Sequence, residues 1–179
     1  MKKILIGATA AAALAAGTFG AVSANASAPA AETKTATVAD TANRNLQQST
    51  HLTVDAATKA AQATLDAAEK ANQRITVAVV DRNGNTVVVL RGDGAGPQSY
   101  ESAERKAFTA ASWNAPTSEL VKRLEQAPNL KDIPGTLFLG GGVPVQSKGA
   151  PIAGIGVAGA PSGDLDEQFA KAGVAALSR

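Results

Sequence analysis

Residues 75–90 read ITVAVVDRNGNTVVVL, in which two apolar, β-branched runs flank the polar group Asp81-Arg82-Asn83-Gly84. β-branched residues are enriched in strands, and a short turn sequence between two such runs is typical of an antiparallel hairpin. Because Asn-Gly favours the two positive φ angles of a type I′ turn, we expect that turn at Asn83 and Gly84. The continuous apolar character of both runs predicts strands that are buried on both faces.

The segments on either side of the hairpin add helices and further strands. Apolar residues recur at three- and four-residue spacing after Thr53, a favourable N-cap, which predicts a helix over residues 53–72. Short connections later in the chain favour antiparallel pairing. We therefore predict an α/β (α+β) fold with the order α-ββ-αα-βββ-α, in which helices pack on a single antiparallel sheet of about five strands. Beyond the hairpin, the expected elements are helices over 98–113, 117–126 and 165–177 and strands over 137–139, 143–146 and 152–158.

The first 26 residues have the pattern of a secretory signal. Met1-Lys2-Lys3 is positive, an apolar and small-residue run follows, and Ala24-Asn25-Ala26 provides the small residues that a signal peptidase accepts. A transmembrane anchor is the less favoured alternative, because the run consists mostly of alanine and glycine. Residues 27–48 are small and polar without a period, which predicts a disordered tether. Residues 49–179 suffice for one compact domain, which we expect to be secreted and extracellular.

Charge and composition exclude several classes of function. Removing Lys2 and Lys3 with the signal leaves 15 of the 17 basic residues, which equals the 15 acidic residues. A neutral chain without a basic cluster gives no support for nucleic-acid binding. Cysteine is absent, so the fold depends on packing rather than on disulfides. The single histidine, His51, excludes a zinc site made of several imidazoles, and no nucleophile motif accompanies it for a serine-histidine-acid triad.

Residues 131–145 read KDIPGTLFLGGGVPV and contain the most distinctive local chemistry. Three consecutive glycines let another backbone or a flat ligand approach closely. The hydroxyl of Thr136 stands at the entrance to the apolar run 137–139, and a polar atom there needs a partner. One interpretation is a ligand site with an apolar wall and with Lys131 and Arg123 at its rim. The other is a tight crossing between strands, and the residues alone leave both open.

Three further side chains are candidate metal ligands. Glu101 and Glu104 are three residues apart on the predicted helix 98–113, so their carboxylates share a face and could hold a cation together. The alternative is a solvated ion pair between Glu101 and Arg105, four residues further on. His51 lies just before the first helix and, when neutral, can ligate a metal or haem iron. An ordinary exposed histidine is the alternative interpretation.

Several motifs together resemble the GlcG/HbpS family over nearly the whole of residues 52–177. They are VAVVDRNG (77–84), RGDGAGPQ (91–98), ESAERKA (101–107), NAPTSEL (114–120), LKDIPGTLFLGGGVPV (130–145) and GIGVAGAPSG (154–163). The match keeps their order and looks most similar to the secreted haem-binding branch of that family. The resemblance implies an α/β fold, a homo-oligomer, extracellular binding of haem and iron, and redox-linked signalling to a membrane sensor kinase of a two-component system.

The resemblance also assigns roles by position. Thr136, in the IPGT motif, would be the axial contact to haem iron, Glu101 and Glu104 would bind iron at the surface, and His51 would be an additional iron ligand. Arg74 stands where the family pattern has a second histidine, and an arginine cannot coordinate a metal because it stays protonated. A small-molecule enzyme of the wider family and a purely structural oligomer are the alternative functions.

Overall fold

The computed structural model describes residues 39–178, which fall into two units that divide between Asn45 and Leu46. The described part of the first unit contains one short 3-10 helix, η1 Asn43–Asn45, and its residues are exposed. The predicted signal, residues 1–26, and most of the predicted tether lie outside the described residues. Among residues 39–178, no helix has the length and hydropathy that a membrane span requires.

The second unit is built on one antiparallel sheet of four strands, in the order β2-β1-β4-β3. The predicted hairpin forms, with Val77 opposite Leu90, and Val77 also pairs with Val157 on the other side of β1. The α+β class and the antiparallel pairing are confirmed, but the sheet has four strands rather than about five. The strands are β1 Thr76–Asp81, β2 Thr86–Arg91, β3 Gly142–Ser147 and β4 Ala150–Ala158.

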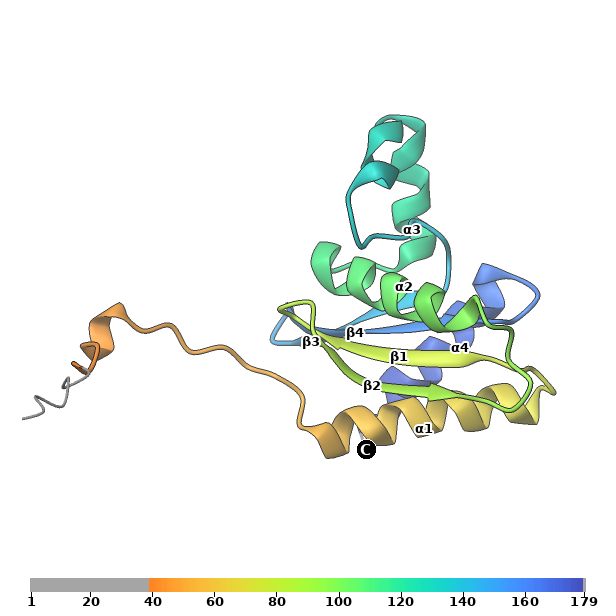
Figure 1. Cartoon of the computed structure of the whole chain (residues 1–179), viewed down its shortest axis with the longest axis horizontal. Helices are drawn as coiled ribbons and strands as arrows, with labels where there is room; N and C mark the ends of the chain where they lie inside the picture. Colours follow the sequence, from red (N-terminus) through yellow and green to blue (C-terminus); the bar gives the residue numbers. More distant parts are fainter. Residues whose placement is uncertain (1–38, 179) are drawn as a thin grey trace, which may run out of the picture. The chain divides into compact units, whose positions relative to one another are not determined.

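Helices cover both faces of this sheet (Figure 1). α1 Val54–Lys70 and α4 Gly163–Ala176 pack on one face, and α2 Ser99–Trp113 packs on the other. The central strand β1 therefore divides its side chains between two cores. Val77 and Val79 face α1 and α4, whereas Ala78 and Val80 face α2. A continuous apolar run is what a strand covered on both faces requires.

The second strand of the hairpin and its turn differ from the prediction. β2 is an edge strand whose central residues are only half-buried, so burial on both faces holds for β1 and is wrong for β2. Gly84 has a positive φ of 90°, but Asn83 does not have a positive φ, so the turn is not type I′. Asp81 organises it instead, because its Oδ1 accepts hydrogen bonds from the amides of Asn83 and Asn85 at 2.8 and 2.9 Å.

The segment between α2 and β3 forms a projection that begins with the predicted helix, shortened and continued by 3-10 turns (Figure 1). α3 Thr117–Val121 is followed by two 3-10 helices, η2 Lys122–Glu125 and η3 Pro128–Asp132, and no residue from 122 to 135 is buried. The strand predicted at 137–139 is absent there. Pro134 offers no amide donor, and Gly135, with φ 78°, turns the chain immediately before Thr136.

The triple glycine allows close packing between elements of the fold. A Cβ on Gly142 would overlap the carbonyl oxygen of Lys106 in α2, and a Cβ on Gly140 would lie 3.1 Å from Gly163 at the start of α4. Helices can approach a backbone this closely only where it carries no side chain. The interpretation of a tight crossing is therefore supported. A Cβ on Gly141 would lie 2.6 Å from the carbonyl oxygen of Val157, so strand β4 as well as the two helices packs against the glycines.

Candidate functional site

Thr136 lies in the irregular segment before β3, and it is only 1% exposed. Its hydroxyl donates a hydrogen bond to the carbonyl oxygen of Ile133 at 2.7 Å. The amide of Leu137 donates to the hydroxyl oxygen of Thr109 in α2 at 2.8 Å. The hydroxyl of Thr136 thus finds its partner within its own turn, and the following residue is tied to α2.

Arg105 connects Thr136 to the acidic pair on α2. One guanidinium nitrogen donates to the carbonyl oxygen of Thr136 at 2.7 Å, and another lies 3.6 Å from Oε1 of Glu101. The side chain of Glu101 nevertheless remains 77% exposed, so this carboxylate stays accessible to a cation. Glu104 takes a different partner, because its Oε1 accepts a hydrogen bond from the hydroxyl of Thr86 at 3.0 Å. Glu101 therefore forms the expected ion pair with Arg105. It also lies three residues before Glu104 on α2, so the expected shared face is compatible with this ion pair.

A cavity of about 280 Å³ lies beside Glu104 and Arg105. Glu104, Arg105 and Phe108 line it from α2, and Gly84 and Gly135 line it from two loops. The ring of Phe108 packs against both glycines, and a Cβ on Gly84 would lie 2.8 Å from it. The fold therefore brings the ring of Phe108, the carboxylate of Glu104 and the guanidinium of Arg105 together beside Gly135, which precedes Thr136 in the chain. Phe108 does not stand out in the sequence, because a phenylalanine on a helix usually indicates a core position.

The apolar wall expected along residues 137–145 is not open to a ligand. Phe138, Val143 and Val145 are buried, and the ring of Phe138 packs edge-on against Trp113 with 5.2 Å between the centroids. Leu139, at 52% exposure, is the large apolar residue of this stretch that faces outward. The prediction of an apolar wall is wrong because the fold packs most of these side chains inward, where they contribute to stability.

His51 lies beside the turn between β1 and β2. Its Nε2 is 2.7 Å from the hydroxyl of Ser49, and its Nδ1 is 3.8 Å from the carboxylate of Asp81. Burial raises the pKa of Asp81, but the hydrogen bonds from Asn85 and Asn83, together with His51, outweigh it and leave the pKa below its usual value. The structure therefore places His51 beside the ionised carboxylate of Asp81. The two residues are thirty positions apart in the chain, and their spacing in the sequence did not indicate this contact.

The acidic pair fits part of an iron site. Glu101 and Glu104 offer carboxylate oxygens from one face of α2, a ligand type suited to hard cations. Among the described residues, no group of three or more histidine, cysteine, aspartate or glutamate side chains could hold a metal ion. His51 therefore does not complete a three-ligand group with these glutamates, and further ligands would come from water or another chain.

The fit for haem within one chain is also partial. The oxygen of Thr136 keeps an acceptor lone pair while its hydroxyl donates to Ile133. At 1% exposure, however, it needs a local shift of residues 133–136 to reach an iron atom. The cavity of about 280 Å³ is small compared with the ~300–1,000 Å³ of typical small-ligand sites. One chain would therefore enclose a macrocycle only in part.

Comparison with known proteins connects these features to a family. The family model described as "Haem degrading protein HbpS-like" matches residues 52–175. The crystal structure of HbpS is 75% identical in sequence with a TM-score of 0.76, and the match covers 76% of this chain and 97% of that one. A double mutant of Streptomyces reticuli HbpS gives 74% identity and the same TM-score, with coverages of 78% and 95%.

A more distant solved structure has the same fold and is itself a complex with haem. The complex of PduOC with haem is 25% identical, has a TM-score of 0.65, and matches 71% of this chain and 95% of its own. The family model spans α1 to α4, and the HbpS structures keep this architecture at about three quarters identity. The chain therefore belongs to the family of HbpS-like haem-degrading proteins.

Proposed function

We propose that this protein is a secreted, homo-oligomeric haem- and iron-binding protein that scavenges haem and acts as a redox-linked accessory of a two-component sensor kinase. The observation that carries the proposal is the cavity in which Glu104, Arg105 and Phe108 meet Gly135, the neighbour of Thr136. Family membership and the likeness to the haem complex of PduOC support haem as the ligand. The predicted signal and the resemblance support secretion and the kinase partner.

Three residues in or beside the cavity would contribute different contacts to haem. Phe108 and Arg105 line the cavity and would provide apolar contact and a cation for a propionate, and Thr136, which follows the lining residue Gly135, would offer an oxygen to the iron. Arg105 also positions Thr136, because it holds the carbonyl oxygen of that residue at 2.7 Å. A neutral hydroxyl is a weak iron ligand compared with histidine or thiolate. Such a site suits exchangeable capture of haem better than a permanently bound cofactor.

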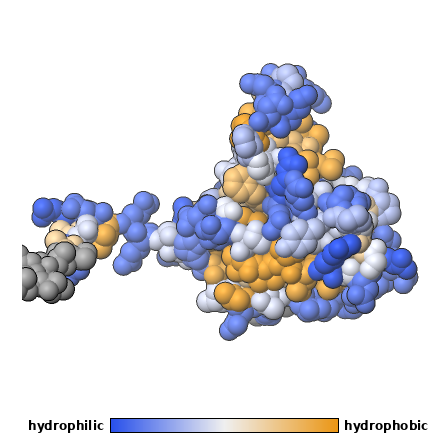
Figure 2. Space-filling view, viewed as in Figure 1, coloured by the Kyte–Doolittle hydropathy of each residue, from blue (hydrophilic) through white to orange (hydrophobic). Residues whose placement is uncertain are grey.

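A second copy of the chain would complete the haem site, because one chain would enclose the macrocycle only in part. β2 presents Val87, Val88 and Val89, all half-buried, along an edge strand with unpaired backbone groups. Figure 2 shows apolar side chains gathered over this part of the surface. An unpaired edge strand is a template for pairing with another chain, and large apolar surface patches mark sites of protein–protein contact. The surface therefore supports a homo-oligomer.

Titration of the protein with haemin, followed by absorbance, tests the proposed function. A Soret shift that saturates at stoichiometric haemin would support binding. Loss of the Soret band with appearance of a linear tetrapyrrole in the presence of a reductant would instead assign the degrading activity named in the family description. An unchanged haemin spectrum would overturn the proposal and favour a small-molecule enzyme or a structural oligomer.

Replacing both Glu101 and Glu104 by alanine is expected to weaken iron binding. Haem uptake is compared in the single variant Glu101→Ala, which should leave it intact, because Glu104 but not Glu101 lines the cavity proposed for haem. The solved HbpS double mutant carries two glutamate-to-aspartate changes three residues apart, the spacing of this pair. Because Glu101 is exposed and its ion pair with Arg105 contributes only ~0.3–0.5 kcal/mol, the melting temperature should change little. Equilibrium dialysis with Fe²⁺ measures the loss.

The matched control for this variant is the double change of Glu119 and Glu125 to alanine, since both glutamates are exposed and lie outside α2. The control should bind iron like the unmodified protein. Unchanged iron binding in the Glu101 and Glu104 variant would show that the acidic pair is not the site. A large drop in melting temperature would show that the pair is structural.

A further inference from the structure

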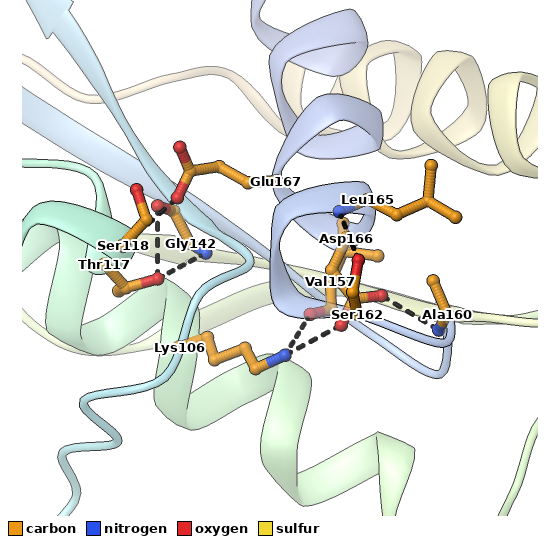
Figure 3. Close-up of polar contacts among 10 residues, drawn as sticks. All are labelled: Lys106, Thr117, Ser118, Gly142, Val157, Ala160, Ser162, Leu165, Asp166 and Glu167. Carbon is orange, nitrogen blue, oxygen red and sulfur yellow. Dashed lines mark hydrogen bonds and ion pairs between the residues drawn. The ribbon is translucent and has the colours of Figure 1, made fainter. Parts of the chain in front are cut away.

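A second polar cluster lies on another side of α2, where this helix meets the start of α4 (Figure 3). The ammonium group of Lys106 donates hydrogen bonds to Oδ2 of Asp166 and to the carbonyl oxygen of Val157, each at 2.9 Å. The two charged side chains are only 3% and 4% exposed. The second carboxylate oxygen of Asp166 accepts the amide of Ala160 at 3.0 Å. The cluster therefore links α2, β4 and the loop that leads into α4.

Stability alone gives little reason for a charged pair at this position. Removing two charges from water costs roughly as much as their attraction returns, and apolar replacements of such pairs are often as stable. Burial raises the pKa of Asp166, and the ion pair with Lys106 compensates for only part of that effect. Buried ionisable groups that border a cleft are frequently part of a binding site.

A cavity of about 360 Å³ opens onto this pair. The hydroxyl of Ser102 makes no hydrogen bond to another group in the described part of the chain. The hydroxyl of Ser162 accepts the amide of Leu165 at 3.2 Å and keeps its own proton available as a donor. The groups that matter for recognition are Ser102 and Lys106 from α2, Leu139 and Ala158 beside them, and Ser162 and Asp166 from the start of α4.

The charge balance of the cavity determines the kind of molecule it suits. The charges of Lys106 and Asp166 cancel, so an anion would compete with Asp166 for Lys106, and a cation would compete with Lys106 for Asp166. A lysine has three donors, and two are used here. A carboxylate has about four acceptor sites, and Lys106 and the amides of Ala160 and Gly159 take up three of them. The pair therefore offers one donor and one acceptor side by side, which matches a hydroxyl group.

We propose that this cavity binds a small uncharged polyol of roughly three to six carbons, a size that follows from about 30 Å³ for each water-sized group. The Lys106–Asp166 pair forms the polar floor and engages one hydroxyl of the ligand as both donor and acceptor. Ser102 and Ser162 bind neighbouring hydroxyls, and Leu139 and Ala158 contact the carbon chain. This site shares no lining residue with the cavity proposed for haem, so it is a separate binding function.

Calorimetric titration of the haem-free full chain with glycerol, xylitol and sorbitol tests the proposal. At least one of these polyols should give a saturable heat for one site per chain. Glycerate and 3-amino-1,2-propanediol, which add a negative or a positive charge, should bind at least tenfold more weakly. A thermal shift alone is not an adequate measurement, because polyols stabilise folded proteins by exclusion from the surface without binding.

Ser102→Phe fills the cavity and should weaken polyol binding at least tenfold, since Ser102 is half-buried at its wall. Ser112→Phe makes the same substitution at an exposed position of α2 outside the cavity and should bind like the unmodified protein. Polyol binding that persists in Ser102→Phe, equal binding of the charged analogues, or no saturable heat with any polyol would overturn the proposal. Haemin titration of the same samples separates this result from the proposed haem function.

Discussion

Replacing Lys106 by methionine is expected to lower the free energy of unfolding by about 3–5 kcal/mol, the usual cost of removing one partner of a buried ion pair. Methionine occupies much of the space of the lysine stem but leaves the carboxylate of Asp166 buried without its cation. The carbonyl oxygen of Val157 loses its donor as well. Urea denaturation at pH 7 measures the change.

The loss should depend on pH in a defined direction. Because burial keeps the pKa of Asp166 above its ordinary value of 3.8, the native state holds this proton more tightly than the unfolded chain does. The contribution of protonated Asp166 to stability is therefore fully present below pH 3.8 and is lost as pH rises through the native pKa. Lys106 lowers the pKa of Asp166, so replacing Lys106 raises that pKa further and enlarges the stability lost between acidic and neutral pH. The variant should approach the stability of the unmodified protein at about pH 4 and fall furthest behind it at about pH 7.

Lys171→Met is the matched control, because Lys171 pairs with Glu167 at 3.0 Å while its own side chain is 57% exposed. It should cost no more than about 1 kcal/mol. Lys106→Met combined with Asp166→Leu removes both charges and should recover part of the stability that the single change loses. Equal stability losses for Lys106→Met and Lys171→Met would show that burial of the Lys106 pair has no energetic consequence.

Thr136→Val is expected to weaken haem binding about tenfold or more, which corresponds to ~1.4 kcal/mol. Valine keeps the shape and β-branching but removes the oxygen that would contact iron. The hydrogen bond from the hydroxyl to Ile133, 2.7 Å long, is lost too, and this should cost about 1 kcal/mol of folding free energy. The Soret band of the bound haem should change in position or intensity. Absorbance titration with haemin gives both the affinity and the spectrum.

Thr136→Ser is the control, because serine restores the hydroxyl and should return both the affinity and the spectrum toward those of the unmodified protein. If Thr136→Val binds haem with unchanged affinity and an unchanged spectrum, Thr136 is not the ligand. His51, which lies beside Asp81, is then the residue to test next.

Local patterns predicted the parts of the fold that depend on neighbours in the chain. The β-branched runs 75–80 and 85–90 predicted the hairpin, and helical spacing after Thr53 predicted α1, whose hydroxyl cap accepts the amide of Ala56 at 3.1 Å. The same reasoning missed the turn type, because the side chain of Asp81 competes for the turn amides and Asn-Gly preference does not report that competition. The apolar run 137–139 likewise predicted a strand, but these residues do not join the sheet, and only Phe138 among them is buried.

The sequence by itself determined the α+β class, the antiparallel hairpin, the shared face of Glu101 and Glu104, and the family resemblance, because each depends on residue type at short spacing. Only the tertiary structure decided which distant groups meet. Arg105 reaches the carbonyl of Thr136 across 31 positions, and Lys106 reaches Asp166 across 60. Periodicity records which side of an element faces the core, but it carries no information on which other element covers that side. For this reason the glycines of residues 140–142 suggested a ligand surface, whereas α2, α4 and strand β4 occupy the space that their missing side chains leave.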